Sequence, residues 1–164
     1  MLIVDDEQRN LMLLYALLKQ QGYKVRVANT GQSALLAAQA RLPDLILLDI
    51  KMPGMSGYEL LKILKAESTT SEVPVIMVSA LADIEDVVKA FKNGCVDYIT
   101  KPFHDDEVLI RVENHLKIKR CQLKLLDSGK ELEKRVRERT RELEQTSKKL
   151  QLYQFSLDHS EEAG

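Results

Sequence analysis

The sequence predicts an α/β fold, in which five parallel strands form a doubly wound sheet and a long C-terminal α-helix follows it. Five short apolar runs alternate with five segments whose apolar residues recur at helical spacing. Such alternation indicates a parallel sheet with helices on both faces, and right-handed crossovers leave few topologies for it. Beyond about residue 116 no strand-like run follows, and heptad spacing takes over.

Each expected strand is short, apolar and bounded by turn residues. The five strands are Met1–Val4, Lys24–Ala28, Asp44–Asp49, Val73–Ser79 and Val96–Thr100. The expected helices are Gln8–Gln20, Gly31–Arg41, Tyr58–Ala66, Asp83–Lys92 and a segment that begins at Asp105. Three helices are preceded by short polar residues, which accept hydrogen bonds from the first free N–H groups. These candidate N-caps are Thr30, Ser56 and Asp83.

The composition is that of a globular protein. Hydrophobic residues make up 45% of the chain and charged residues 30%, which favours a folded core over wholesale disorder. No apolar stretch approaches the roughly 20 residues that span a bilayer, and the first apolar run is followed at once by acids, unlike a signal peptide. Cys95 and Cys121 lie far apart, which indicates two reduced thiols and a cytoplasmic location.

The charge distribution divides the chain. Residues 1–116 hold 12 lysines and arginines against 16 acids, whereas residues 117–157 hold 12 against 6. We therefore predict one domain over residues 1–116, a helical coiled-coil extension over residues 117–157 and a disordered tail over residues 158–164. The sequence Asp127-Ser-Gly129 interrupts the heptad phase and indicates a stutter or a kink.

The extension carries a heptad seam whose members step by alternating four and three residues. The seam consists of Leu132, Val136, Arg139, Leu143, Thr146, Leu150, Tyr153 and Leu157. Arg139 and Thr146 are weak core residues, so the seam is imperfect. A single helix would leave this narrow stripe in water, and the pattern therefore favours a homodimer through the C-terminal helix.

Charged residues follow three of the expected strands. Asp5-Asp6-Glu7 comes after the first, Asp49 ends the third, and Lys101-Pro102 comes after the fifth. The carboxyl ends of parallel strands meet at one edge, which is where such sheets bind ligands. We therefore expect Asp5, Asp6, Asp49 and Lys101 to share one pocket. Three carboxylates and one ammonium predict a site for a divalent cation and a phosphoryl group.

The chemistry of these groups favours phosphoryl acceptance. Mg²⁺ (or Mn²⁺) takes oxygen ligands and is usually held by one or two carboxylates together with a phosphate. Asp49 stands alone at its strand end and is the best candidate for attack on phosphorus, which gives an acyl phosphate. Lys101 and the cation would neutralise charge on the transferring oxygens, and Ser79 would hydrogen-bond one of them.

Each residue also has a simpler interpretation. The acidic run suits a helix N-terminus, where carboxylates are favoured. Taken singly, Asp49 is a turn residue, Ser79 a solvated hydroxyl and Lys101 a surface lysine. The functional interpretation is preferred because the residues occur in this order at the ends of strands.

The first part of the sequence resembles a known family. Residues 1 to about 116 are similar to the receiver domain of two-component response regulators over its whole length. The matching segments are Ile3-Val-Asp-Asp-Glu7, Leu47-Leu-Asp-Ile-Lys-Met-Pro-Gly54 with Gly57, Val75-Ile-Met-Val-Ser-Ala80 and Gly94-Cys-Val-Asp-Tyr-Ile-Thr-Lys-Pro-Phe103. The resemblance implies a flavodoxin-like fold and a phosphoryl group accepted on Asp49 from a sensor histidine kinase. It describes a phosphoacceptor that catalyses its own modification and is not a turnover enzyme.

The resemblance also assigns roles to individual residues. It implies that Asp6, Asp49 and the main-chain carbonyl of Lys51 hold Mg²⁺, with Asp5 acting through water. Ser79 and Lys101 would contact the phosphoryl group, Ser79 and Tyr98 would form a switch pair, and Lys101-Pro102 would be a cis peptide. Lys51 and Leu81 flank the pocket at positions that tune dephosphorylation, and the apolar Leu81 predicts a long-lived phosphate.

The output of the chain stays open. The segment Leu132–Leu150 resembles helices that join receivers to effector modules, and no second set of strands or helix-turn-helix follows. Either an effector domain is missing, so that the chain is a fragment, or the helix itself is the output; we favour the fragment.

Three other functions are weighed against the receiver. A hydrolase with an aspartyl-phosphate intermediate would pair two Asp residues two apart after the first strand, whereas Asp5 and Asp6 are adjacent. Binding of nucleic acid is disfavoured because the basic residues of the extension are interleaved with acids and almost no aromatics. A histidine kinase fragment with His159 as its phosphorylated residue is disfavoured because the residues after it do not match.

Overall fold

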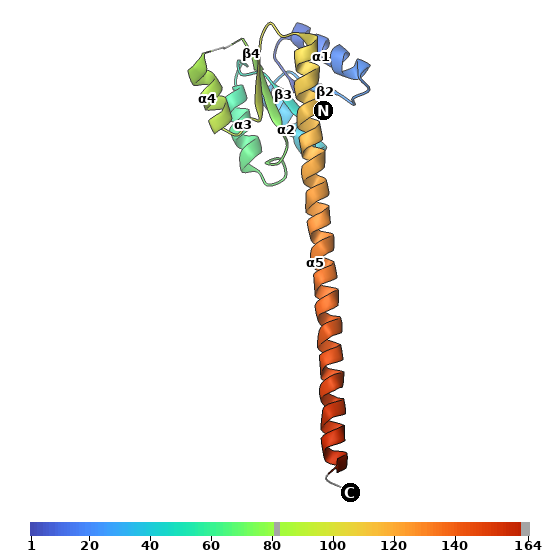
Figure 1. Ribbon diagram of the computed structural model, residues 1–164. Coiled ribbons are helices and arrows are strands. Elements are labelled where there is room, and N and C mark those ends of the chain that lie inside the picture. The colour runs from blue at the N-terminus through green and yellow to red at the C-terminus, as the bar shows by residue number, and fades with distance from the viewer. Residues whose placement is uncertain (81–82, 162–164) are drawn as a thin grey trace. The chain divides into compact units, whose positions relative to one another are not determined.

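A five-stranded parallel sheet forms the centre of the first part of the chain (Figure 1). The computed structural model describes residues 1–80 and 83–161. The strand order is β2-β1-β3-β4-β5. The strands are β1 (Leu2–Val4), β2 (Arg26–Ala28), β3 (Ile46–Leu48), β4 (Val75–Ser79) and β5 (Asp97–Thr100). This arrangement confirms the doubly wound parallel sheet with a long C-terminal helix.

Five helices alternate with the strands. They are α1 (Gln8–Gln20), α2 (Gly31–Ala40), α3 (Gly57–Ala66), α4 (Ile84–Lys92) and α5 (Asp105–Glu161). The bounds of α1 to α4 and the start of α5 agree with the predicted ones within a residue. The strands start later than predicted, because apolar residues such as Leu45 and Val73 are buried but precede the paired part of the sheet. The burial of apolar residues therefore does not define where the pairing of a strand with its neighbours begins.

Local sequence explains most helix starts. Thr30 and Ser56 are N-caps, as predicted, and each also forms a capping box, with Ser33 and Glu59 as the reciprocal partners. Asp83 is the N-cap of α4, but its side chain makes no capping hydrogen bond, so that detail of the prediction was wrong. Acidic residues in the first turn of α4 favour its N-terminus instead, through the helix dipole.

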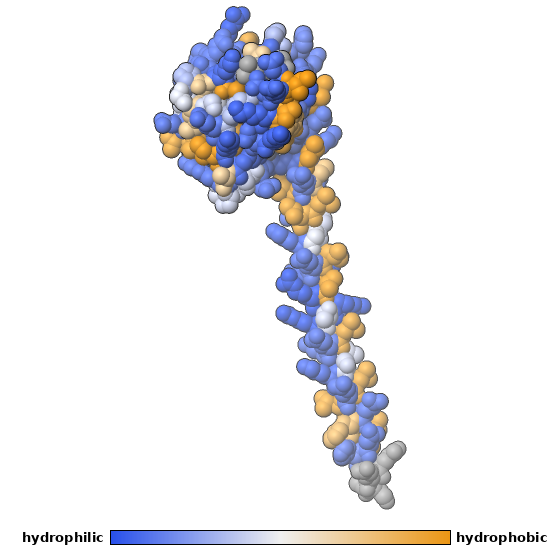
Figure 2. Space-filling model, turned by 90° about the vertical axis from the view of Figure 1, so that its left-hand side faces the viewer, coloured by the Kyte–Doolittle hydropathy of each residue, from blue (hydrophilic) through white to orange (hydrophobic). Residues whose placement is uncertain are grey.

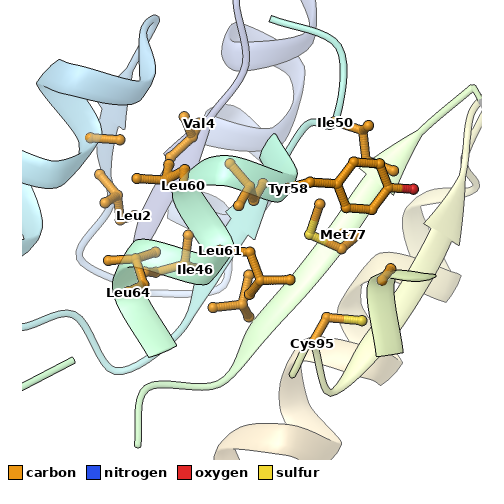
Figure 3. Packing of buried hydrophobic residues seen from close by; sticks show 14 of the residues in the cluster. Leu2, Val4, Ile46, Ile50, Tyr58, Leu60, Leu61, Leu64, Met77 and Cys95 are labelled. Atoms are coloured by element: carbon orange, nitrogen blue, oxygen red, sulfur yellow. The ribbon is translucent and has the colours of Figure 1, made fainter. Parts of the chain in front are cut away.

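The two faces of the sheet carry separate hydrophobic cores, as the alternation of side chains in a strand requires. One core packs Val4, Leu48 and Met77 against α2, α3 and α4 (Figure 3). The other core packs Ile3 and its neighbours in the sheet against α1 and the first turns of α5. Both faces are covered, which explains why the strands are apolar throughout rather than alternating.

The start of β5 is tied to α5 by an acidic residue. The Asp97 carboxylate accepts hydrogen bonds from Arg111 Nη1 at 2.8 Å and from the Tyr98 backbone N–H at 2.8 Å, and it lies 2.9 Å from His115 Nε2. Burial acts to raise the pKa of Asp97, but these partners outweigh it and hold the pKa below its ordinary value. The ionised carboxylate is therefore more favourable in the folded chain than in the unfolded one.

Replacing Asp97 with asparagine should destabilise the domain in a pH-dependent way. Because the folded pKa is depressed below 3.8, the stabilisation is present above that pH and is lost as the pH falls through the folded value. We expect Asp97→Asn to lower the free energy of unfolding by about 1 kcal/mol at pH 7. The gap should close below about pH 4. Urea titrations at several pH values measure it, with the exposed Asp127→Asn as the control; a gap that is constant with pH would contradict the assignment.

The chain forms two compact units, Met1–Lys119 and Arg120–Gly164. In the second unit the helix α5 passes without a break through Asp127-Ser-Gly129, where a stutter or kink was expected. Its apolar residues gather along one side, with hydrophilic residues on the other (Figure 2). The exposed members include Leu132, Val136, Leu143, Leu150 and Leu157, all from the predicted seam.

Two further expectations concern the second unit and the chain as a whole. The helix continues to Glu161, so the first residues of the predicted tail, 158–161, are helical, and residues 162–164 lie outside the described part. The boundaries at 116 and 157 stay predictions. Among the described helices, none combines the length and the apolar character that crossing a membrane requires.

Candidate functional site

Two strand ends bring three acidic residues together at the carboxyl edge of the sheet. Asp5 follows β1, Asp49 follows β3, and Asp6 follows Asp5. One carboxylate oxygen from each of the three lies within 4.8 Å of the others. Asp5 and Asp49 are buried, with 2% and 5% of their surface exposed, while Asp6 is exposed. The structure therefore brings together the three carboxylates that the sequence placed in one pocket.

Lys101, which follows β5, reaches into the same cluster. Its Nζ donates to Asp5 Oδ2 at 2.8 Å and lies 3.4 Å from Asp49 Oδ1. Burial acts to lower the pKa of Lys101, but the hydrogen bond to Asp5 and the charges of Asp49 and Asp5 raise it above its ordinary value. The ammonium group stays charged and offsets part of the repulsion between the carboxylates.

The electrostatics single out Asp49. The pKa of Asp49 is raised to about 6, chiefly by burial and also by the charges of Asp5 and Asp6, against the opposing effect of Lys101. Ionised Asp49 is thus costly in this cluster, and an added cation would relieve that cost. Hard oxygen donors in this number are the donor set that Mg²⁺ and Mn²⁺ prefer, so the residues fit such an ion.

Ser79 and Tyr98 lie next to the acidic cluster on β4 and β5. Ser79 is buried at the end of β4, and its carbonyl oxygen accepts the Lys101 backbone N–H at 2.9 Å. Tyr98 is also buried; burial raises the pKa of its hydroxyl, which a hydrogen bond with the Ser79 side chain opposes. The two residues of the expected switch pair are therefore in contact.

The remaining expected site residues are placed less completely. Lys51 lies in the loop between β3 and α3 with its side chain exposed, two residues after Asp49. The Lys101-Pro102 peptide bond is cis, the geometry that the resemblance implies. Leu81, expected to limit access of water, lies outside the described residues. The roles assigned to these residues stay predictions.

Two residues near Asp49 were given no role by sequence reasoning, although Gly57 was among the segments that carry the family resemblance. A side chain at Gly57 would overlap the carbonyl oxygen of Asp49, and the Gly57 N–H donates to the Ile50 carbonyl at 2.8 Å. Tyr58, the next residue, is almost fully buried and donates its hydroxyl to the Asp86 carbonyl at 3.0 Å. A glycine directly after a serine cap was the available signal for the first; Tyr58 resembled an ordinary core aromatic.

Comparison with known proteins defines the class of this chain. The response regulator receiver domain family matches residues 1–113. The chain therefore belongs to the response regulator receiver domain family. Receiver domains are the phosphoacceptor modules of two-component signalling, are not classical turnover enzymes and bind Mg²⁺ through acidic residues.

Curated relatives and solved structures agree with this family. The response regulator PleD of Caulobacter vibrioides is 39% identical over 72% of this chain and 26% of its own length. The DNA-binding response regulator MtrA of Mycobacterium tuberculosis is 38% identical over 71% of this chain and 50% of its own length. This chain thus spans between a quarter and a half of these relatives.

Three solved structures cover between 71% and 77% of the chain. A crystal structure described as a putative response regulator from Chloroflexus aurantiacus has a TM-score of 0.68 and 37% identity, covering 71% of this chain and 95% of that one. The Francisella response regulator 1452 receiver domain has a TM-score of 0.67 and 35% identity, covering 71% and 94%. NtrX from Brucella abortus has a TM-score of 0.72 and 34% identity, covering 77% of this chain and 28% of that one.

Proposed function

We propose that this chain accepts a phosphoryl group on Asp49 from the phosphohistidine of a sensor histidine kinase, in a step that depends on Mg²⁺ or Mn²⁺. The observation that carries the proposal is the cluster of Asp5, Asp6 and Asp49 with Lys101 at one sheet edge. Asp49 is the acceptor because it is the carboxylate that both the acidic pair and the lysine face. Membership of the receiver family supports the same assignment.

The residues of the cluster divide the work of the transfer. A carboxylate oxygen of Asp49 forms a bond to phosphorus while the bond from phosphorus to the histidine nitrogen breaks, and the imidazole leaves with that electron pair. Lys101 Nζ, 3.4 Å from Asp49, is placed to hold one transferring oxygen. Asp6, Asp49 and the Lys51 carbonyl would hold the cation, with Asp5 acting through water. The cation supplies charge neutralisation at the phosphoryl oxygens when bound.

The signal would leave the site through Ser79 and Tyr98. A phosphoryl group that draws the Ser79 hydroxyl toward itself favours one of two packings of the β4–β5 edge, and Tyr98 occupies the space beside it. The contact between the two side chains supports this route. Phosphorylation shifts the populations of the two packings only to the extent that the phosphoryl group interacts more favourably with one of them.

The second unit suits pairing with another copy of this chain. Its seam exposes Leu132, Val136, Leu143, Leu150 and Leu157 on a helix that is charged elsewhere, as in Figure 2. Parallel pairing of two such helices would bury the stripe. PleD and MtrA are longer than this chain, and the similarity covers 26% and 50% of their lengths. An effector domain joined through this helix is therefore part of the proposal.

Substituting Asp49 tests the acceptor directly. The wild-type chain and Asp49→Asn are incubated with Mg²⁺ and a small acyl phosphate, and intact mass and oligomeric state are measured. We expect the wild type to gain the mass of one phosphoryl group and Asp49→Asn to gain none, because an amide is not a nucleophile of this kind. EDTA should abolish the gain in the wild type.

Two controls sharpen the test. Asp44→Asn changes an aspartate in unit 1 outside the cluster, and its mass gain should equal that of the wild type. Equal modification of Asp49→Asn and the wild type would contradict the proposal. Leu143→Lys, in the seam, should shift the chain toward monomer without changing the mass gain; an unaltered oligomeric state would contradict the paired helix alone.

A further inference from the structure

The helix α3 begins on the main chain of the proposed phosphoacceptor. A side chain at Gly57 would overlap the carbonyl oxygen of Asp49 and lie 2.8 Å from the Ile50 Cα. The Gly57 N–H also donates to the Ile50 carbonyl at 2.8 Å. The first residue of α3 is thus packed on backbone atoms with no side chain between them. A shift of the Asp49 loop must therefore be transmitted to the start of α3.

The next residue, Tyr58, joins α3 to α4. Its hydroxyl donates to the Asp86 carbonyl, in the first turn of α4, at 3.0 Å. Lys89, one turn later, holds its Nζ 4.5 Å from the centre of the Tyr58 ring. Tyr58 is 9% exposed, and its ring lies beside Ile50 and Met77 in the core (Figure 3). Tyr58, which directly follows Gly57, therefore contacts two successive turns of α4.

The Tyr58 hydroxyl can donate its hydrogen bond to α4 without being lost by ionisation. Burial and the neighbouring Asp86 raise the pKa of its hydroxyl to about 12, so the group stays a donor at all physiological pH values. The opposite surface of α4 exposes Ile84, Val88 and Phe91, whereas Ala90 is buried and Val87 is partly buried against the core. Few core contacts hold α4, so one hydrogen bond at its first turn weighs heavily in its position.

We propose that Tyr58 couples the Asp49 loop to α4, as a second route beside Ser79 and Tyr98. This inference rests on the proposed function, since it concerns how phosphorylation of Asp49 is transmitted. Gly57 carries the shift from the loop to α3, and the Tyr58 hydroxyl carries it to the first turn of α4. Tyr58 is a positioning residue, because it touches neither the phosphoryl group nor the cation ligands.

Removing only the hydroxyl tests the coupling. Tyr58→Phe keeps the ring in the core and the contact with Lys89, so the domain stays folded. Hydrogen exchange of residues 83–93 is measured with and without Mg²⁺ and a small acyl phosphate, alongside intact mass. We expect α4 amides of unphosphorylated Tyr58→Phe to exchange about fivefold faster than in the wild type. The change that phosphorylation causes in α4 should fall to about half or less, while the mass gain at Asp49 stays the same.

Tyr15→Phe is the matched control, since it removes a hydroxyl that contacts Lys19 within α1 at 3.0 Å. It should leave α4 as in the wild type. If α4 exchanged faster in Tyr58→Phe but responded to phosphorylation as in the wild type, Tyr58 would be merely structural and the coupling would be overturned. The coupling would also be overturned if the exchange of α4 in Tyr58→Phe equalled that in the wild type. A wild type that gains no mass would contradict the proposed function, and the coupling that rests on it falls as well.

Discussion

Gly57→Ala is expected to be among the most damaging single substitutions in the first unit, lowering the free energy of unfolding by about 3 kcal/mol. The added methyl group would overlap the Asp49 carbonyl oxygen and meet the Ile50 Cα at 2.8 Å and the Asp49 carbonyl carbon at 2.9 Å. All three obstacles are backbone atoms in a loop beside the core. They cannot move aside as the end of a flexible side chain would, so α3 and the Asp49 loop must separate.

Urea titrations followed by circular dichroism measure the effect, and phosphorylation should fall with it because Asp49 is displaced. Gly129→Ala is the matched control. Gly129 lies within α5, and an added Cβ there meets nothing within 4 Å. Alanine should strengthen that helix by up to about 1 kcal/mol. If Gly57→Ala unfolded at the same urea concentration as the wild type, the close packing at this position would be wrong.

Sequence reasoning recovered the fold because the signals were local and repeated. The apolar runs and the N-caps at Thr30 and Ser56 each act within a few residues. The start of each strand was less certain, since buried residues such as Leu45 and Val73 look the same in sequence whether or not they pair. Pairing depends on the neighbouring strand, which local sequence does not contain.

The candidate site likewise contains residues that the sequence placed correctly and contacts that it did not predict. Asp5, Asp6, Asp49 and Lys101 were placed together because strand ends in a parallel sheet share an edge. The contact of Tyr58 with α4 was not foreseen, because it depends on the path of two helices that are far apart in sequence. The same holds for Asp97, whose partners Arg111 and His115 come from α5. Polar contacts between distant parts of the chain do not produce a periodic pattern in the sequence.

Lys101→Met is the second substitution with a large expected effect. Lys101 is the cation that lies against both buried carboxylates, with its side chain 17% exposed. Methionine has a similar length and no charge, so Asp5 and Asp49 would face each other uncompensated. Removing one partner of a buried ion pair costs about 3 kcal/mol or more. We expect a loss of that order in the free energy of unfolding at pH 8 in EDTA, and a phosphorylation rate about a hundredfold lower.

The loss should depend on pH and on the cation. The pKa of Asp49 is already about 6, above its ordinary 3.8, so its ionised form lowers stability increasingly as the pH rises from 3.8 through 6. Without Lys101 this pKa rises further, and the damage should therefore be smaller at pH 5 than at pH 8. Mg²⁺ replaces part of the missing positive charge, so millimolar Mg²⁺ should restore part of the stability.

A double substitution separates charge from packing. Asp49→Asn in the Lys101→Met background removes one of the two opposed carboxylates and should recover much of the lost stability, which a packing defect at position 101 would not allow. Lys62→Met changes an exposed lysine on α3 and should alter the free energy of unfolding by less than about 0.5 kcal/mol. Equal urea midpoints for Lys101→Met and Lys62→Met would show that the cluster does not need its cation, and the electrostatic account of Asp49 would then be wrong.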